Sequence, residues 1–205
     1  MTTRTRQGFG VLLLLCSLAA ACAIRPGRLD LAPTTIANPT IHPLRVGAVV
    51  DKRFLPYKIK YRYWSSTPLT WSLEGLPDAF VKTLSPHFVS VEPLRVGRSI
   101  SPAEHDVVAR MSVDRLHFDG ANTTVGTDTV DLTMTFTVEQ PDGTAVFRTT
   151  LSARGSSEYN QPCAFCKPDA HEAYMKAFRA VFAQLSEALG GFRYPVGSKD
   201  GRYGR

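Results

Sequence analysis

Apolar and polar residues alternate most strictly from Thr127 to Glu139, in the stretch TDTVDLTMTFTVE. Successive side chains of a β-strand point to opposite faces, so strict alternation predicts a strand with one buried face. The turn sequence QPDG follows at residues 140–143, and alternation resumes in residues 145–154 (AVFRTTLSAR). The pattern therefore predicts a β-hairpin whose first strand has a threonine-rich polar face. Its expected buried residues are Val130, Leu132, Met134, Phe136 and Val138.

Two earlier segments alternate in the same way and are also predicted to be strands. They are residues 44–51 (LRVGAVVD) and residues 106–118 (DVVARMSVDRLHF). The apolar face of the first consists of Leu44, Val46, Ala48 and Val50, and that of the second of Val107, Ala109, Met111 and Val113.

Helical spacing of apolar residues appears twice. In the first helix, Pro77 is acceptable only in the first turn, and the helix should end before Pro86. Its apolar positions are Leu73, Leu76, Phe80 and Leu84. The second helix is predicted from about Asp169, which forms a capping pair with Glu172, to Leu189, before two glycines. Its stripe consists of Tyr174, Ala177, Val181, Leu185 and Leu189.

The order of these elements predicts an α+β fold. We expect a two-layer sandwich with a mainly antiparallel sheet of about four strands and two helices on one face. The threonine-rich face would then remain open to water. If the first strand runs parallel to the strand reached through the helix, the crossover should be right-handed.

The N-terminus has the three parts of a secretory signal. Arg4 and Arg6 precede an apolar run, and small residues lead directly into Cys22 in the sequence LAAAC. This arrangement is typical of a bacterial lipobox, although Leu18 stands one place earlier than the usual position. We predict cleavage before Cys22 and modification of its thiol with diacylglycerol, and of its amine with a fatty acid such as palmitate. The alternative is an ordinary secreted protein in which Cys22 is incidental.

The prediction divides the chain into four parts. Residues 1–21 are the signal peptide, 22–43 a proline-containing lipidated tether, 44–190 a periplasmic α/β domain and 191–205 a disordered tail. Ala23, rather than Asp, after the cysteine favours the periplasmic face of the outer membrane of a Gram-negative bacterium. Loss of residues 1–21 lowers the net charge from +6 to about +4. Outside the cytoplasm this charge favours anionic lipid or polysaccharide rather than nucleic acid.

The sequence resembles the YajG-like outer-membrane lipoproteins in its lipobox, its tether, the Asp51-Lys52-Arg53 sequence after the first strand, and the order of its helices and hairpin. It is similar more widely to envelope proteins with a TolB-N-terminal-like or CsgG-like α/β domain, which include PelC and LpoB. The resemblance covers roughly residues 44–190. It implies an α/β fold and an envelope location, and a fold alone does not specify a function.

Cys163 and Cys166 form a C-x-x-C sequence just before the last predicted helix. We expect a structural disulfide that closes this loop in an oxidising compartment. A redox-active dithiol is the alternative, because a helix N-terminus lowers thiol pKa values, but the preceding sequence lacks a thioredoxin-like βαβ unit. Zinc would need both cysteines, His171 and a fourth ligand that the sequence does not identify. No metal or other cofactor is expected beyond the covalent lipid.

Residues 54–64 (FLPYKIKYRYW) interleave basic and aromatic residues. They could bind an anionic glycan or lipid head group. Alternatively, the lysines protect an exposed sheet edge from aggregation. The candidate contacts are Lys58, Lys60, Arg62, Tyr61, Tyr63 and Trp64.

The five histidines are scattered, and neither a nucleophile elbow nor a phosphate-binding glycine loop is present. We therefore expect a non-enzymatic lipoprotein that serves as an accessory or scaffold in export, secretion or wall synthesis, with an envelope protein as partner. The alternatives are a binding module for anionic lipid, lipopolysaccharide or polysaccharide, and a thiol oxidoreductase. The sequence predicts no particular oligomeric state.

Overall fold

The computed structural model describes residues 31, 39–50, 58–61, 69–94, 104–120, 125–160 and 170–194. Its elements, in chain order, are β1 (His42–Val50), β2 (Lys58–Tyr61), β3 (Leu69–Ser72), α2 (Leu76–Leu84), β4 (Phe88–Pro93), β5 (Val107–Asp119), β6 (Val125–Glu139), β7 (Ala145–Asn160) and α3 (Ala170–Gly190).

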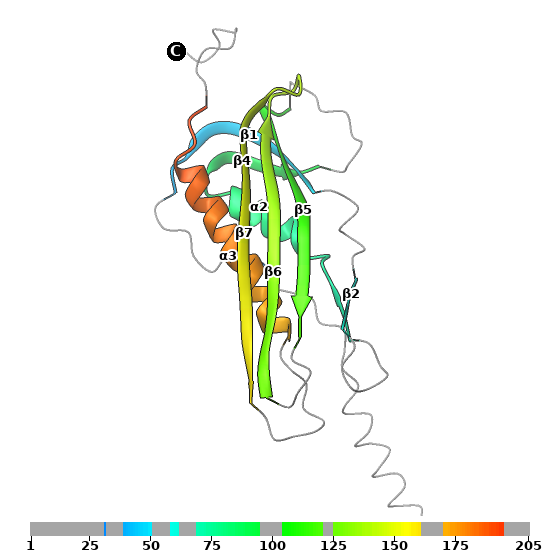
Figure 1. Cartoon of the computed structure of the whole chain (residues 1–205). Coiled ribbons are helices and arrows are strands. Elements are labelled where there is room, and N and C mark those ends of the chain that lie inside the picture. The colour runs from blue at the N-terminus through cyan, green and yellow to red at the C-terminus, as the bar shows by residue number, and fades with distance from the viewer. Residues whose placement is uncertain are drawn as a thin grey trace, which may run out of the picture.

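Five of the strands form one mixed sheet in the order β4-β1-β5-β6-β7 (Figure 1). Strand β1 runs parallel to both of its neighbours, β4 and β5, whereas β5, β6 and β7 are antiparallel. The α+β class and the two helices agree with the sequence-based prediction. The expectation of about four mainly antiparallel strands was wrong in detail, because the structure contains β4 and two parallel pairs. After β1, the chain crosses through α2 and returns beside β1 as β4, which is how parallel neighbours are connected.

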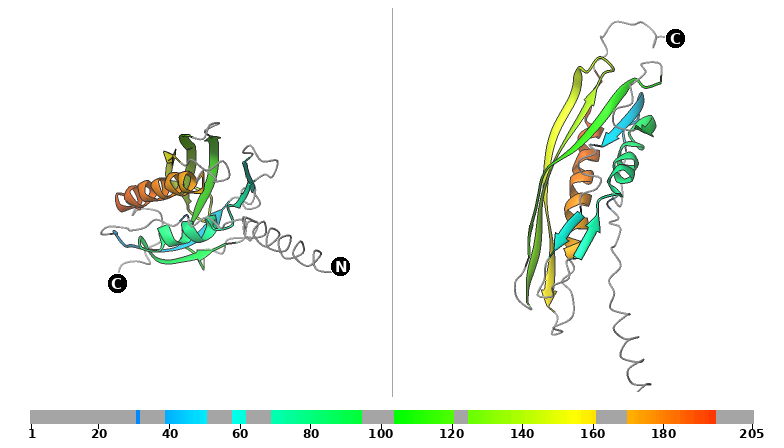
Figure 2. Two further views of the ribbon diagram at one scale, coloured as in Figure 1. Left: turned by 90° about the horizontal axis from the view of Figure 1, so that it is seen from below. Right: turned by 90° about the vertical axis from the view of Figure 1, so that its right-hand side faces the viewer.

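The helices α2 and α3 cover one face of this sheet (Figure 2). Neither helix covers the other face of β5, β6 and β7. The alternation along β6 explains why one face is buried and the other polar. The predicted buried residues all lie under the helices: Val130, Leu132, Met134, Phe136 and Val138. Phe136 lies at the centre of this core, with its ring 5.9 Å from that of Phe80 on α2 and 6.3 Å from that of Phe182 on α3. The predicted stripe on α3 is also buried.

Helix α2 is shorter than the apolar spacing suggested. Its first turn contains Pro77 and it ends at Leu84, before Pro86, as expected. The residues before it form β3, which pairs with β2 in a separate two-stranded ribbon. Leu73, expected in the helix, lies between β3 and α2 and is nevertheless fully buried.

Helix α3 approaches β7 closely at Gly155. A Cβ atom at this position would lie 1.9 Å from the carbonyl oxygen of Ala173 and 2.6 Å from the backbone nitrogen of Ala177. Only glycine allows the helix and strand backbones to approach this closely. Lys176 and Gln184 of α3 also donate hydrogen bonds to strand carbonyls of β7, at residues 156 and 152.

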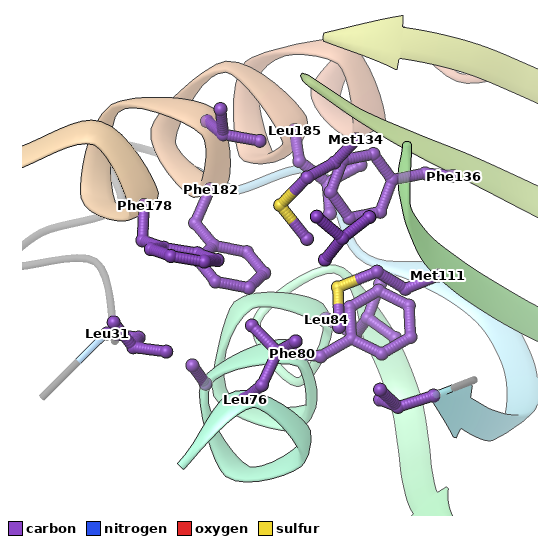
Figure 3. Packing of buried hydrophobic residues seen from close by; sticks show 14 of the residues in the cluster. Leu31, Leu76, Phe80, Leu84, Met111, Met134, Phe136, Phe178, Phe182 and Leu185 are labelled. Atoms are coloured by element: carbon purple, nitrogen blue, oxygen red, sulfur yellow. The ribbon is translucent and has the colours of Figure 1, made fainter. Parts of the chain in front are cut away.

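Packed residues extend beyond the predicted domain limits of 44 and 190 at both ends. Strand β1 begins at His42, and Leu31, within the expected tether, is only 1% exposed. Leu31 belongs to the hydrophobic core that also contains Leu76 of α2 and Phe178 of α3 (Figure 3). Full burial of a leucine side chain contributes about 2 kcal/mol. At the other end, Phe192 is 4% exposed and its ring contacts those of His42 and Phe147.

Candidate functional site

The uncovered face of the sheet carries rows of polar side chains that cross the strands. Strand register places Val49, Arg110, Thr137 and Arg148 in one row over β1, β5, β6 and β7. The next row contains Ser112, Thr135 and Thr150. These residues come from separate parts of the chain and are brought together only by strand pairing. We call this surface the open sheet face.

A groove of about 470 Å³ lies on the open sheet face. Its lining combines two guanidinium groups, one carboxylate and three hydroxyl groups with apolar side chains from β1, β5 and β7. The lining residues are Val49, Arg110, Met111, Ser112, Thr135, Thr137, Glu139, Ala145 and Arg148. Arg110 donates to Glu139 over 2.7 Å, so Glu139 neutralises only one of the two arginines in the groove. The remaining positive charge and the hydroxyl groups suit a polar or anionic group of a ligand or partner.

Hydroxyl groups bridge the strands below the groove. The oxygen atoms of Thr133 and Ser152 are 2.9 Å apart, as are those of Thr135 and Thr150. Thr135 also donates to the Asp114 carboxylate over 2.6 Å. These cross-strand pairs connect the polar side chains of β6 to those of β5 and β7.

An ion pair continues the open sheet face toward the far end of the hairpin. Arg154 donates to both oxygens of Asp131, over 2.6 and 3.0 Å. This hydrogen bonding lowers the pKa of Asp131 and, reciprocally, raises the pKa of Arg154. Both side chains are solvent-accessible, so the pair orders the surface more than it stabilises the fold.

A second polar cluster is buried at the other side of the molecule, where the C-terminal end of α3 meets β1 and β4. The imidazole Nε2 of His42 lies 3.0 Å from the carbonyl oxygen of Leu189, and that of His87 lies 2.8 Å from Ser186 Oγ. The backbone nitrogen of His42 donates to the His87 carbonyl over 2.7 Å. We call His42, His87 and Ser186 the histidine cluster.

Burial lowers the pKa of His87, and the neighbouring His42 lowers it further. His87 is 1% exposed and Ser186 is 7% exposed. A serine nucleophile with a histidine base needs access to substrate, which this burial denies. The histidine cluster therefore connects α3 to the β1–β4 edge, and the sequence analysis, which treated the histidines as scattered, missed it. Its members are up to 144 residues apart in the chain, from His42 to Ser186, and no spacing motif reveals them.

Most of the residues proposed from the sequence lie outside the part of the chain that the structure describes. This applies to Cys22, to the Cys163–Cys166 pair, and to Arg62, Tyr63 and Trp64 of the basic-aromatic segment. For Lys58, Lys60 and Tyr61 the structure describes the backbone of β2, with Lys58 opposite Ser72 and Lys60 opposite Thr70 of β3. The structure therefore places Lys58 and Lys60 in a two-stranded ribbon, and these site assignments stay predictions.

The described residues contain no group of three or more His, Cys, Asp or Glu side chains placed to hold a metal ion. His171, the histidine considered for zinc, lies half-buried in the first turn of α3. Within the same described ranges, no helix has the length and apolar character needed to cross a bilayer.

No protein-family model matches this sequence, and no curated protein sequence matches it either. Several solved structures are similar in shape. A Xanthomonas campestris protein described under the family model DUF330 is 12% identical with a TM-score of 0.48, covering 80% of this chain and 92% of that one. A minor lipoprotein from Acinetobacter baumannii is 13% identical with a TM-score of 0.43, covering 76% and 96%.

A PelC dodecamer from Paraburkholderia phytofirmans is 13% identical with a TM-score of 0.39, covering 75% of this chain and 94% of that chain. These similarities are too low to carry a function across. None of them names the YajG-like family, so that assignment stays a prediction from the sequence.

Proposed function

We propose that this chain is a non-enzymatic lipoprotein of the bacterial envelope, anchored through lipid at Cys22, which presents the open sheet face to a protein partner. The observation that supports the proposal is that three long strands carry rows of polar side chains on one face, which is hollowed by the groove around Arg110, Thr137 and Arg148. An accessory protein needs a stable surface rather than a reactive centre, and this face fits that requirement.

The anchor rests on the sequence LAAAC. Two or more acyl chains hold a protein stably on a membrane, because each buried methylene contributes about 0.8 kcal/mol. The outer membrane, with the domain in the periplasm, is the location that Ala23 favours. We propose that the partner belongs to an assembly for export, secretion or wall synthesis.

Metabolic labelling with palmitate tests the anchor. The expected result is label in the wild-type protein and none in Cys22→Ala, and fractionation should move Cys22→Ala from the membrane to the soluble periplasm. Equal labelling of both proteins, or no label in either, would contradict the anchor. Cys163→Ala is the matched control, because it removes a cysteine without touching the lipobox.

Binding of an anionic glycan or lipid is a second candidate function. The observation in its favour is the unbalanced positive charge of the groove, where Arg148 joins the Arg110–Glu139 pair. Arg148→Glu should then weaken binding of lipopolysaccharide at low salt, and Lys58→Glu with Lys60→Glu would show whether β2 contributes. If no variant changes the affinity, the protein-partner function is favoured.

A further inference from the structure

Strand β7 is the last strand of the sheet, and its outer edge pairs with no other strand that the structure describes (Figure 1). Helix α3 closes part of this edge with two long polar side chains. Lys176 Nζ donates to the carbonyl oxygen of Ser156 over 3.0 Å, and Gln184 Nε2 donates to that of Ser152 over 3.4 Å. Unpaired backbone groups at a sheet edge are a template on which another strand can add. The bonds from α3 occupy this template in the C-terminal half of β7.

The N-terminal half of the β7 edge lacks these bonds. In an antiparallel pair the N–H and C=O groups of one residue point to the same side, and successive residues alternate. Because the two serine carbonyls point away from β6, the backbone groups of Arg148 and Thr150 do so as well. Within the described ranges, no hydrogen bond reaches the backbone of these two residues from the outer side. The next residue on this face of α3 after Gln184 is Ala188, whose side chain has no group that can donate.

The opposite edge of the sheet is formed by β4, which is a poorer template. It has six residues and ends at Pro93, and short strands and prolines both discourage pairing at an edge. Strand β7 has sixteen residues, and its open segment, residues 147–151, includes a residue of the groove. An added strand is therefore better accommodated beside β7.

Side chains of the open segment alternate between two environments. Arg148 and Thr150 lie exposed on the open sheet face, whereas Phe147 and Leu151 lie half-buried against the core. The ring of Phe147 is 5.5 Å from that of Phe192. Arg148 carries the unbalanced positive charge of the groove. A strand beside β7 would thus bring acidic side chains to Arg148 on one face and apolar side chains to Phe147 on the other.

We propose that the protein partner adds an extended segment to the edge of β7 at residues 147–151, and that this segment alternates acidic and apolar residues. This inference rests on the proposed function and deepens it, because it specifies how the partner binds. Main-chain hydrogen bonds to residues 148 and 150 provide affinity, and the alternating side chains provide specificity. The added strand widens the open sheet face beside the groove.

Binding of a synthetic peptide to the full-length chain tests the strand addition. The probe is a fluorescent peptide of about nine residues that alternates glutamate and valine. Fluorescence anisotropy measures its affinity, and amide hydrogen exchange at residues 148 and 150 should slow when it binds. Arg148→Glu should weaken binding by about tenfold or more, and a peptide that alternates lysine and valine should bind this variant better than the wild-type chain.

Two methylated peptides separate strand addition from charge attraction alone. One carries N-methyl groups on its glutamates and the other on its valines, so both have the same charge. Only one alternating set of N–H groups faces β7 in an added strand, so one peptide should lose binding and the other should retain it. Equal affinities of the two peptides, or no binding of the unmethylated peptide at about 1 mM, would overturn the inference.

Proline substitutions in intact envelopes separate this inference from the proposed function. Thr150→Pro removes an outward N–H from the open segment, and Ser156→Pro is the matched control in the half that α3 closes. Proline is tolerated where the N–H faces away from the sheet, and circular dichroism checks that both variants fold. A benzophenone amino acid at Ser112, in the groove, captures the partner.

The protein adduct from position 112 should be lost in Thr150→Pro and kept in Ser156→Pro. An adduct that both variants keep would refute only the strand addition, because the partner then binds the open sheet face without pairing to β7. The absence of any adduct with an otherwise wild-type chain would contradict the proposed function itself.

Discussion

The two faces of β6 are made by the same fifteen residues, yet they serve different purposes. On the inner face, Met134 is 0% and Phe136 is 2% exposed under the two helices. On the outer face, the intervening threonines are half-buried and exchange hydrogen bonds with β5 and β7. Stability is therefore concentrated on one face, which leaves the composition of the other free to serve binding.

The difference between the two faces of β6 indicates where a binding function can lie in a small α+β domain. Inner-face substitutions create cavities or clashes, whereas outer-face substitutions change a surface that water already reaches. If the open sheet face binds a partner, substitutions of its residues should leave the isolated protein folded. They should weaken only the binding of the partner. The following predictions test this separation, from the largest effect to the smallest.

Phe136→Ala should have the largest effect on the free energy of unfolding, a loss of about 4 kcal/mol, because it removes the ring between Phe80 and Phe182. Thr137→Ala, the adjacent residue on the open sheet face, should change it by less than about 1 kcal/mol. Urea unfolding followed by circular dichroism measures both. Similar losses for the two variants would mean that the faces are not energetically distinct.

Gly155→Ala should cost about 3 kcal/mol, because its Cβ would clash with the backbone of α3 at Ala173 and force the helix away from β7. The control is Gly190→Ala near the end of α3, where an added Cβ meets no atom within 4 Å. Replacing this helical glycine should stabilise the protein by up to about 1 kcal/mol. Thermal unfolding measures both changes. Equal melting temperatures for the two variants would contradict the close approach of α3 to β7 at Gly155.

Acidification should weaken the histidine cluster. Because burial lowers the pKa of His87 below its ordinary value of 6.5, the unfolded chain binds more protons than the folded one between these two pKa values. The free energy of unfolding should therefore fall as pH decreases below about 6.5 and be unaffected by this group above it. In His87→Gln, urea unfolding at a series of pH values should show a shallower fall. An unchanged slope would contradict the assignment.

Thr135→Val should have the smallest effect, about 1 kcal/mol or less, since it removes hydrogen bonds to Asp114 and Thr150 at a solvent-accessible site while keeping the side-chain shape. The midpoint of urea unfolding measures this change. A loss comparable to that of Phe136→Ala would show that the polar rows, rather than the core, hold the hairpin together.

Local periodicity predicted the parts of the fold that depend on a single element. The faces of β5 and β6 followed from the period of two, and the buried stripe of α3 followed from helical spacing. Strand β4 was not predicted from the sequence, because it has only six residues, follows α2 closely and ends at Pro93. Its parallel pairing with β1 depends on how α2 packs, and the sequence contains no local signal of that.

The groove and the histidine cluster could not be predicted, because both depend on long-range pairing. Arg110 and Arg148 lie on β5 and β7, and only the register with Thr137 of β6 places them in one row. The burial of Leu31 was equally hidden, since a lone leucine among prolines and polar residues resembles any other linker residue. By contrast, the lipidation predicted at Cys22 rests on the local sequence LAAAC and does not depend on the fold.

Site-specific photo-crosslinking in intact envelopes tests the central claim most directly. A benzophenone amino acid replaces Arg148 in the groove or, as the control, Glu187 on the exposed side of α3. The account predicts one defined protein adduct from position 148, lost when Thr137→Trp fills the groove, and none from position 187. Adducts from position 187 alone, or adducts from position 148 that survive Thr137→Trp, would contradict a partner on the open sheet face.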